Sequence, residues 1–380
     1  MDDQLLLYIQ TYSPQYLLMD TSKEEIWSFI AEWYDPLPQA TKQYLLKYYP
    51  HQNQAEMYDM KLKRIFLKKS PCPPELSSED YFIGSQIVLY SRDLKIVDYA
   101  DGVTKQRLSR QIQTSVLVLP ADTLLHWGTV INDLLASGFN ISYLKTISVD
   151  KRVSLSLAVI LGESESSREI ASISSSREPC LVLRVHKENA VRDLADLARS
   201  MSKKLKSTVL VPKDSPGVES LLELLVDTRS SQSTATLDSC TCCIIKPHAV
   251  KSKQLGQILD AILAQGFTLS AAASLHFSKA QAEEFLEVYR GVTPDFHEQV
   301  LQLSSGLCVA LELQAARAVE GFREVAGPWD VEMAKELRPN TLRALYGVDN
   351  VRNAVHCTDL ETDGATECEY IFKIISSSST

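Results

Sequence analysis

The stretch Ile262-Leu-Ala-Gln-Gly266-Phe267-Thr-Leu-Ser270 decides the fold, because the chain carries an earlier version of it, Leu134-Leu-Ala-Ser-Gly138-Phe139-Asn-Ile-Ser142. The two versions lie 128 positions apart, and the same spacing relates Cys180-Leu-Val-Leu to Cys308-Val-Ala-Leu. A spacing that stays constant through several elements indicates two tandem copies of one fold. We place the first copy at residues 111–227 and the second at residues 236–380, with a polar linker at 228–235.

Each copy follows the same order of secondary-structure patterns. The copies begin with a short apolar run, Ser115-Val-Leu-Val-Leu119 in the first and Thr241-Cys-Cys-Ile-Ile245 in the second. Apolar residues at helical spacing follow, as in Leu255 to Ala264, and Gly266 is a plausible helix stop. Strands that alternate with helices, beginning β-α-β, indicate an α/β sandwich.

Length and composition limit the classes of protein. A chain of 380 residues is expected to form two or three domains, and 45% hydrophobic content supplies several cores. The net charge of −9 argues against general nucleic-acid binding. No apolar run approaches the length of a membrane span, so we expect no membrane insertion. The start Met1-Asp2-Asp3-Gln4 lacks the basic residues of a secretory signal, so we expect a cytosolic chain.

The cluster Cys240-Thr-Cys242-Cys243, with His248 nearby, allows two interpretations. One is a zinc site, but the chain offers no matching second pair of ligands at the usual spacing. The other is a buried strand that contains small apolar cysteines and continues into Ile244-Ile245. We favour the buried strand.

The segment Asn353-Ala-Val-His356-Cys-Thr358-Asp359 carries the chemistry of the second copy. Together with Lys246, Arg323 and Arg343, it supplies a nucleophile, cations and an amide, which suit a nucleoside triphosphate and a phosphohistidine intermediate. The segment resembles the active-histidine signature of the nucleoside diphosphate kinase family. The resemblance covers roughly Ser239 to Ile375.

This resemblance implies a fold and a reaction. The α+β fold would be ferredoxin-like, βαββαβ in each copy, with helices on one face of an antiparallel sheet. His356 would take the γ-phosphate of a triphosphate such as ATP and pass it to a nucleoside diphosphate in a ping-pong reaction. Glu367 lies at the family's position for the carboxylate that orients the histidine, and Thr358 replaces its serine partner.

The resemblance also assigns nucleotide-binding residues. Lys246, Arg323 and Arg343 would hold the phosphates, since guanidinium groups chelate phosphate oxygens in a fixed geometry. Asn353 would contact the ribose and phosphates, and Phe296 would stack on the base. Mg²⁺ would arrive on the nucleotide phosphates.

The sequence departs from the family at four places in the second copy. The usual Asp-Gly after Lys-Pro is His248-Ala249, and the glycine after the active histidine is Cys357. The family's threonine near the phosphates falls at about Trp329. Its active-site tyrosine falls at about Leu286, although Tyr289 can replace it with a small shift. The lost hydroxyls are expected to slow the reaction.

The first copy lacks the residues of a phosphoryl-transfer site. The lysine position falls at Leu119 and the arginine position at Ala195, and no histidine occurs between His186 and His248. We therefore expect a degenerate copy that serves as a packing partner. A site for another ligand is the alternative, and it has no support in the sequence. The copies can form an internal pseudo-dimer, whereas kinases of this family are usually hexamers; the sequence leaves this choice open.

The front end has a different composition. Eleven of the fifteen tyrosines lie in the first hundred residues. Short aromatic and β-branched runs separated by turns predict a small β domain at residues 23–110, behind an extension at 1–22. The domain resembles the DM-type domain of axonemal proteins, which has a pleckstrin-homology-like fold. Its basic stretch from Lys61 to Lys69 can meet an acidic surface such as tubulin, or it is a solvated strand edge.

Two functions follow from these resemblances. The first is an axonemal nucleoside diphosphate kinase, located in the cytoskeleton of a cilium or flagellum and associated with its doublet microtubules. The alternative is a non-catalytic microtubule inner protein that keeps the kinase fold, with or without nucleotide binding. The retained site residues favour the first function, while the degenerate copy and the altered loop at His248 favour the second.

Overall fold

The computed structural model describes residues 25–35, 40–74, 76–90, 92–108, 112–161, 179–227 and 233–376. The predicted extension at 1–22 and most of the predicted linker lie outside these residues. The chain divides into two compact units, one with residues up to Gly84 and Lys95–Lys105, the other with Ser85–Leu94 and residues from Gln106 onward. No helix in the described ranges is both long enough and apolar enough to cross a membrane.

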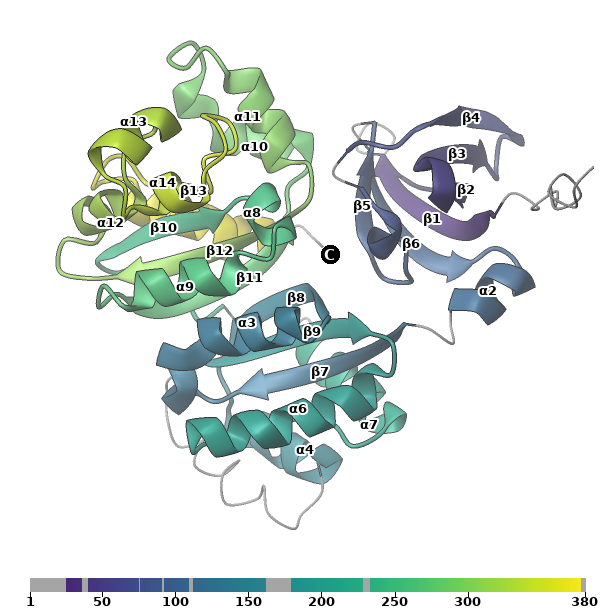
Figure 1. Cartoon of the computed structure of the whole chain (residues 1–380), viewed down its shortest axis with the longest axis horizontal. Helices are drawn as coiled ribbons and strands as arrows, with labels where there is room; N and C mark the ends of the chain where they lie inside the picture. The colour runs from purple at the N-terminus through teal and green to yellow at the C-terminus, as the bar shows by residue number, and fades with distance from the viewer. Residues whose placement is uncertain are drawn as a thin grey trace, which may run out of the picture. The chain divides into compact units, whose positions relative to one another are not determined.

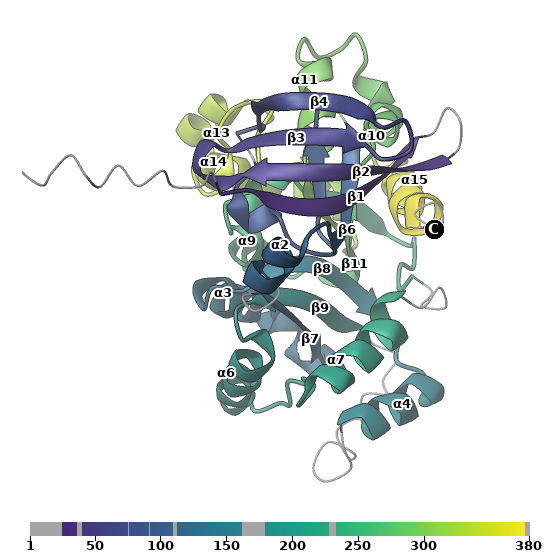
Figure 2. The same ribbon diagram turned by 90° about the vertical axis from the view of Figure 1, so that its right-hand side faces the viewer.

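The front end forms a six-stranded sheet with the strand order β4-β3-β2-β1-β6-β5, in which the strands from β4 to β6 pair antiparallel. Figure 2 shows the ribbons of β1 to β4 side by side. The elements are β1 (Trp27–Asp35), β2 (Ala40–Tyr49), η2 (Pro50–Gln52), β3 (Gln54–Asp59), β4 (Arg64–Pro71), η3 (Ser78–Asp80), β5 (Gln86–Leu89), β6 (Arg92–Tyr99) and then helix α2 (Gly102–Leu108).

Tyrosines of the front end build the core of this sheet. Tyr44, Tyr48 and Tyr81 are almost fully buried, and the rings of Tyr48 and Tyr81 stack at 3.7 Å between centroids. Buried aromatic side chains supply large apolar areas to a small core. The concentration of tyrosines in the first hundred residues therefore has a structural explanation.

The rest of the described chain forms a seven-stranded sheet with the order β13-β10-β12-β11-β8-β9-β7 (Figure 1). Its strands are β7 (Gln113–Leu119), β8 (Asn140–Ile147), β9 (Cys180–Lys187), β10 (Cys240–Ile245), β11 (Thr268–His276), β12 (Leu307–Gln314) and β13 (Val355–Cys357). All neighbouring strands pair antiparallel.

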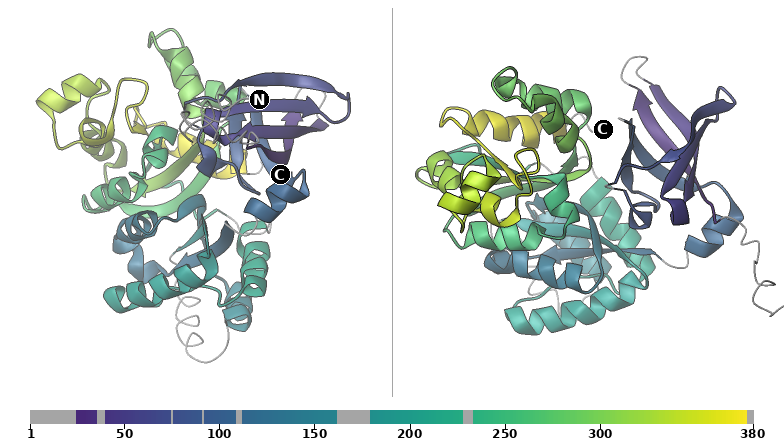
Figure 3. Two further views of the ribbon diagram at one scale, coloured as in Figure 1. Left: turned by 45° about the vertical axis from the view of Figure 1, so that its right-hand side comes forward. Right: turned by 45° about the horizontal axis from the view of Figure 1, so that its top comes forward.

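Helices of both copies pack against this sheet (Figure 3). In the first copy they are η4 (Ala121–His126), α3 (Trp127–Ala136), α4 (Lys151–Leu161), α6 (Ala190–Leu205), α7 (Ser215–Leu222) and η5 (Glu223–Asp227). In the second they are α8 (Pro247–Lys251), α9 (Leu255–Leu263), α10 (Lys279–Phe285), η6 (Glu287–Tyr289), α11 (Phe296–Leu303), α12 (Ala318–Ala326), α13 (Val331–Leu337), α14 (Leu342–Tyr346), α15 (Gly364–Glu369) and η7 (Tyr370–Ile375).

The second copy has the ferredoxin-like order of elements, β10-α9-β11-β12-α12-β13, with neighbours β13-β10-β12-β11. The expectation that helices cover one face is wrong. On β10, Cys243 and Ile245 pack in the core under α9 and α12, while Cys242 and Ile244 pack in the core under α10 and α15. A strand covered on both faces is apolar at every position, which confirms the buried-strand interpretation of Cys240–Ile245.

The first copy is less complete than the predicted βαββαβ unit. Among its described residues, the edge beside β7 holds only an isolated bridge between Val118 and Leu210. In the second copy the corresponding pair is Ile244 with His356, so Leu210 stands where the second copy has its histidine. In the first copy, the position that corresponds to the lysine was predicted at Leu119, and this prediction is wrong. Pro120, not Leu119, matches Lys246, because each follows its strand with the same backbone angles (φ −70°, ψ 160° and φ −72°, ψ 156°).

The two copies join through β8 and β11 into one continuous sheet. The contacts are reciprocal. The Leu144 amide donates to Ser274 Oγ at 2.8 Å, and the Ala272 amide, 128 positions after Leu144, donates to Thr146 Oγ1 at 2.9 Å. One hydrophobic core extends across both copies beneath α3, α6, α9 and α12. The structure thus has the internal pseudo-dimer arrangement.

Candidate active site

His356 lies near one edge of the seven-stranded sheet, in the middle of β13, opposite Ile244 of β10. Its side chain is only 3% exposed. Two aromatic rings lie steeply inclined to the imidazole, Phe285 at 4.9 Å between centroids and 69°, and Tyr289 at 6.4 Å and 76°. The histidine is therefore held in a largely apolar pocket that excludes bulk water.

A carboxylate and a hydroxyl fix the orientation of the His356 ring. His356 Nε2 lies 2.9 Å from Glu367 Oε2, and the Thr358 hydroxyl donates to the same oxygen at 2.8 Å. Thr358 Oγ1 also accepts the Cys242 amide at 3.0 Å, which ties the group to β10. Helix α15 places Glu367 close to β10 because it starts at Gly364, where any Cβ would overlap Cys240 O. The arrangement engages Nε2 and leaves Nδ1 without a hydrogen-bond partner among the described residues.

Lys246 lies at the first turn of α8, directly after β10. Its Nζ donates to Val351 O at 3.0 Å, and the residue is 5% exposed. Burial, helped by the nearby charge of Arg343, lowers the pKa of Lys246 from 10.5 to about 7. A cation this strongly desolvated favours a negative partner over its present carbonyl.

Arg343 is also buried, and backbone groups use most of its donors. Nη1 donates to Gly327 O at 2.9 Å, and Nη2 donates to Val355 O at 3.2 Å. Asn353 lies nearby with its Nδ2 at 3.5 Å from Trp329 O. Its Oδ1 is buried and has no hydrogen-bond partner among the described residues. An unpaired buried acceptor is suited to a donor group on a ligand.

Trp329 lies over both buried cations. Its ring centroid is 5.5 Å from Lys246 Nζ and 5.3 Å from Arg343 Cζ, which is the range of a cation–π contact. The Tyr289 ring is 5.9 Å away on the side of His356. The position at which the family's small threonine falls therefore holds an indole in contact with both buried cations.

A pocket of about 520 Å³ opens beside Trp329. Its lining includes Arg323, Arg338, Arg343 and Asp359, but not Lys246, Asn353, His356 or Phe296. Arg323 is half-exposed and pairs with Asp359 at 3.2 Å, and Asp359 also accepts the Tyr289 hydroxyl at 2.7 Å. Tyr289 rather than Leu286 thus lies at the site, since its hydroxyl bonds Asp359 and its ring contacts His356. The arginines therefore line the pocket, whereas the lysine and the histidine do not.

Phe296 does not join this group. It lies at the start of α11, partly packed on the core beneath α10, and the Arg290 guanidinium covers its ring at 4.7 Å. Phe296 does not line the described pocket, so its predicted role in base stacking stays a prediction.

His248, which replaces the family's aspartate, is a structural residue here. Its Nε2 accepts the Ala354 amide at 3.2 Å, and its Nδ1 lies 3.2 Å from Gln302 Nε2. Burial, with the charge of Lys246, lowers the pKa of His248 to about 4. The ring is therefore neutral at physiological pH and supports the backbone just before His356.

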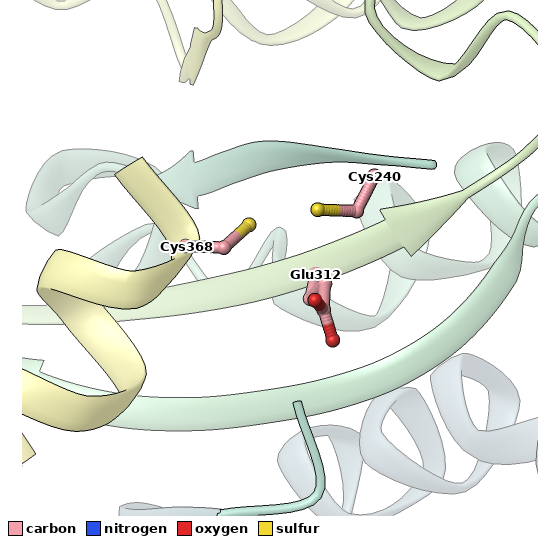
Figure 4. A group of neighbouring side chains, drawn as sticks. All are labelled: Cys240, Glu312 and Cys368. Atoms are coloured by element: carbon pink, nitrogen blue, oxygen red, sulfur yellow. The ribbon is translucent and has the colours of Figure 1, made fainter. Parts of the chain in front are cut away.

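The structure brings Cys240 together with Glu312 and Cys368, rather than with His248 (Figure 4). Their ligand atoms lie within 4.8 Å of one another, a separation at which they could hold a metal ion. However, the Glu312 carboxylate already accepts two backbone amides and the Ser270 hydroxyl. Because the buried carboxylate has these donors, it needs no cation, and hydrogen bonding accounts for the group.

Lys246 leads to a prediction about pH and stability. Between its folded pKa of about 7 and its ordinary 10.5, the unfolded chain binds more protons, so this residue makes the free energy of unfolding rise with pH. Lys246→Met should remove that rise, which is at most about 1.4 kcal/mol per pH unit. The variant should therefore exceed the wild type in stability most at pH 7 and least near pH 10.

Urea unfolding at several pH values measures this effect. Lys251→Met is the matched control, since Lys251 is an exposed lysine on the same helix α8. A Lys246→Met variant whose free energy of unfolding follows the wild-type pH profile would contradict the assignment of a buried lysine with a lowered pKa.

Some site residues were not identified from the sequence. Asp359 belongs to the quoted histidine segment, yet its bonds to Arg323 and Tyr289 depend on tertiary packing. Phe285 carries no signal, because an apolar residue at the end of a helix looks like any core residue. Trp329 was identified as a departure, but its position over two cations requires the folded loop.

Comparisons with known proteins show what this chain is similar to. The family described as nucleoside diphosphate kinase matches residues 239–375. "Nucleoside diphosphate kinase homolog 7" of Mus musculus is 34% identical, over 93% of this chain and 94% of that protein. The nucleoside diphosphate kinase of Aquifex aeolicus is 38% identical over 35% of this chain and 92% of its own length. A crystal structure of an Aquifex aeolicus nucleoside diphosphate kinase covers 36% of this chain and 97% of that chain at 36% identity, with a TM-score of 0.35.

The full-length similarity decides the assignment. The protein of the same name from Rattus norvegicus is also 34% identical, over 94% of this chain and 95% of its own length. Both alignments therefore include the tyrosine-rich front end and both copies. The chain belongs to the nucleoside diphosphate kinase family, and it is similar over nearly its whole length to the proteins called nucleoside diphosphate kinase homolog 7.

Proposed function

We propose that the second copy is a Mg²⁺-dependent nucleoside diphosphate kinase that works through a phosphohistidine at His356. The observation that carries this proposal is the contact of His356 Nε2 with Glu367, which Thr358 supports. A structural histidine needs no second group that orients its carboxylate partner. A nucleophilic histidine benefits from both, because they hold the free nitrogen in line with the phosphorus.

The geometry supports a separate role for each residue in phosphoryl transfer. Glu367 accepts a hydrogen bond from Nε2–H, so the Nδ1 lone pair of His356 is free to attack the γ-phosphorus. The bond from the γ-phosphorus to the bridging oxygen then breaks, and the diphosphate leaves. Lys246, Arg323 and Arg343 neutralise the phosphate charge. A second diphosphate then attacks the phosphohistidine and regenerates the ring.

A nucleotide with its bound metal also fits the polar groups at the site. The unpaired Oδ1 of Asn353 suits a ribose hydroxyl, which is a donor. Mg²⁺ bound to the nucleotide would neutralise phosphate oxygens and so assist departure of the diphosphate. In this proposal the metal arrives on the nucleotide phosphates, because Mg²⁺ favours substrate oxygens over a protein cage.

Formation of the phosphoenzyme tests the function. The full chain is incubated with γ-labelled ATP and Mg²⁺, and the protein is examined for an acid-labile, base-stable label. A nucleoside diphosphate should then discharge the label as the corresponding triphosphate. An unlabelled protein that binds nucleotide would contradict catalysis and favour the alternative of a non-catalytic scaffold.

We further propose that the front end is a pleckstrin-homology-like DM-type domain that attaches the chain to doublet microtubules in a cilium or flagellum. The turn between β3 and β4 supports this proposal. Residues 60–65, which form this turn and the start of β4, are all exposed and mix apolar with basic side chains: Met60, Lys61, Leu62, Lys63, Arg64 and Ile65. Exposed apolar side chains beside positive charges suit an acidic protein surface such as tubulin.

Co-sedimentation of the full chain with microtubules tests this attachment. Lys61→Glu combined with Lys63→Glu should weaken binding about tenfold or more at low salt, because like charges then face the acidic surface. Lys203→Glu with Lys213→Glu, two exposed lysines elsewhere, makes the same charge change as a control. Equal binding by both double variants would contradict a role for the turn.

A further inference from the structure

The cations that should receive phosphate are covered by an aromatic ring. Lys246 is 5% and Arg343 is 4% exposed, and the Trp329 ring lies within 5.5 Å of each charged group. A cation cannot present the same face to an indole and to a phosphate. Binding of phosphate at Lys246 therefore requires the ring to leave.

The residues that line the adjoining pocket show which parts of the site a ligand can reach while Trp329 is in place. Arg343 and Trp329 line the pocket, whereas Lys246 and His356 do not. The Tyr289 ring lies 5.9 Å from the Trp329 ring and 6.4 Å from the His356 ring. Tyr289 therefore contacts both the indole and the imidazole. A ligand that enters the pocket thus meets Trp329 before it reaches the nucleophile.

We propose that Trp329 is a gate: its indole occupies the place that the terminal phosphates of a nucleotide need, and it turns into the adjoining pocket when they bind. The inference deepens the proposed function and rests on it for the identity of the ligand. It adds a residue that controls access to His356, and it accounts for a complete histidine group that is closed to solvent.

The motion belongs to the side chain, because the backbone on both sides of Trp329 is fixed. Gly327 O accepts from Arg343 Nη1 at 2.9 Å, and Asp330 caps α13 by accepting the Met333 amide at 2.8 Å. The pocket of about 520 Å³ lies within the range of ligand pockets, so it has room for an indole. Phosphate then takes over the cations, replacing the cation–π contacts by charge-assisted hydrogen bonds.

A gate of this kind lowers the apparent affinity for nucleotide. When only a fraction of the molecules is open, the measured dissociation constant rises by the inverse of that fraction. Removal of the ring should therefore increase both access to Lys246 and the rate of phosphorylation of His356. Trp329→Thr removes the ring, and Trp329→Phe keeps a smaller one.

The first readout measures access without depending on catalysis. Pyridoxal 5′-phosphate carries an aldehyde and a phosphate; a lysine amine adds to the aldehyde with loss of water, and borohydride reduces the imine. At pH 8 the Lys246 amine is largely unprotonated, since its pKa is about 7. Labelling of Lys246, mapped by mass spectrometry on the full chain, should be at least about tenfold faster in Trp329→Thr than in the wild type, with Trp329→Phe between them.

The second readout is phosphoenzyme formation with γ-labelled ATP and Mg²⁺ in the same variants. We expect faster phosphorylation of Trp329→Thr than of the wild type. Equal labelling of Lys246 in the wild type and the variants would overturn the gate, even if all of them become phosphorylated. Faster labelling in Trp329→Thr with no phosphohistidine in any variant would support the gate and contradict the proposed kinase activity.

A fluorescence measurement keeps the test independent of the folding of Trp329→Thr. Addition of pyrophosphate with Mg²⁺ to the wild type should increase acrylamide quenching of tryptophan emission, as the ring turns toward the open pocket. Trp329→Phe should lack this increase, because its remaining tryptophans, Trp27, Trp33 and Trp127, lie elsewhere. The same quenching change in both proteins would contradict the gate.

Discussion

His356→Ala is expected to abolish the phosphoenzyme, with a loss of at least about a thousandfold in the rate of nucleotide-dependent labelling. The reason is that the variant removes the attacking nitrogen itself, while the cations and the pocket stay in place. Among the described residues, His248 is the other histidine close to the cations, and both its ring nitrogens are engaged by Ala354 and Gln302. No second imidazole is positioned to substitute.

His297→Ala is the matched control for this loss. His297 is an exposed histidine on α11 and has no contact with Glu367 or Thr358 in the structure. Both variants are measured by acid-labile labelling and by transfer of phosphate to a nucleoside diphosphate. Labelling that survives in His356→Ala would show that another residue is the nucleophile, whereas loss in both variants would indicate damage outside the proposed chemistry.

Gly256→Ala should destabilise the protein by about 2–3 kcal/mol, as measured by urea unfolding. A glycine-to-alanine change inside a helix normally stabilises by about 0.5–1 kcal/mol, so the expected sign is the reverse of the usual one. The cause is the contact of α3 with α9. A Cβ on Gly256 would overlap Gly128 O and the Asn132 side chain, and a Cβ on Gly128 would overlap Gly256 O and the Asp260 side chain.

Two further variants make this prediction specific to the contact between the copies. Gly128→Ala should have a similar effect, because the contact is reciprocal across 128 positions. Gly321→Ala on α12 is the control, since its Cβ would approach the Phe267 ring at an ordinary 3.5 Å. We expect Gly321→Ala to be neutral or stabilising. Equal effects of Gly256→Ala and Gly321→Ala would mean that the α3–α9 contact relaxes without cost.

The sequence predicted the parts of the fold that depend on local pattern and repetition. The apolar run at Cys240–Ile245 is a strand, and Gly138 and Gly266 both end helical turns with positive φ. The family resemblance, confirmed by the full-length relatives, supplied the ferredoxin-like order. The helices on both faces were missed, although the unbroken apolar character of β10 already indicates two covered faces.

The residues of the candidate site also fall into two groups, those that the local sequence places and those that tertiary packing places. Residues that share a short segment with His356, such as Thr358, keep their relation to it in any fold that contains the strand. The burial of Lys246 and the contact with Trp329 depend on loops distant in sequence. The match of Pro120 with Lys246, and of Leu210 with His356, required the pairing of strands, because the spacing of the repeat changes between the first strand and the first helix.

The joining of β8 to β11 within one chain has a consequence for how the two copies can diverge. Separate subunits must bind each other strongly enough to survive dilution, but tethered partners meet at an effective concentration that the connection sets. Their union is therefore insensitive to protein abundance. Substitutions in the first copy are constrained by its own core and by the surface it shares with the second, so positions that correspond to the site of the second copy are free to drift while the paired architecture persists.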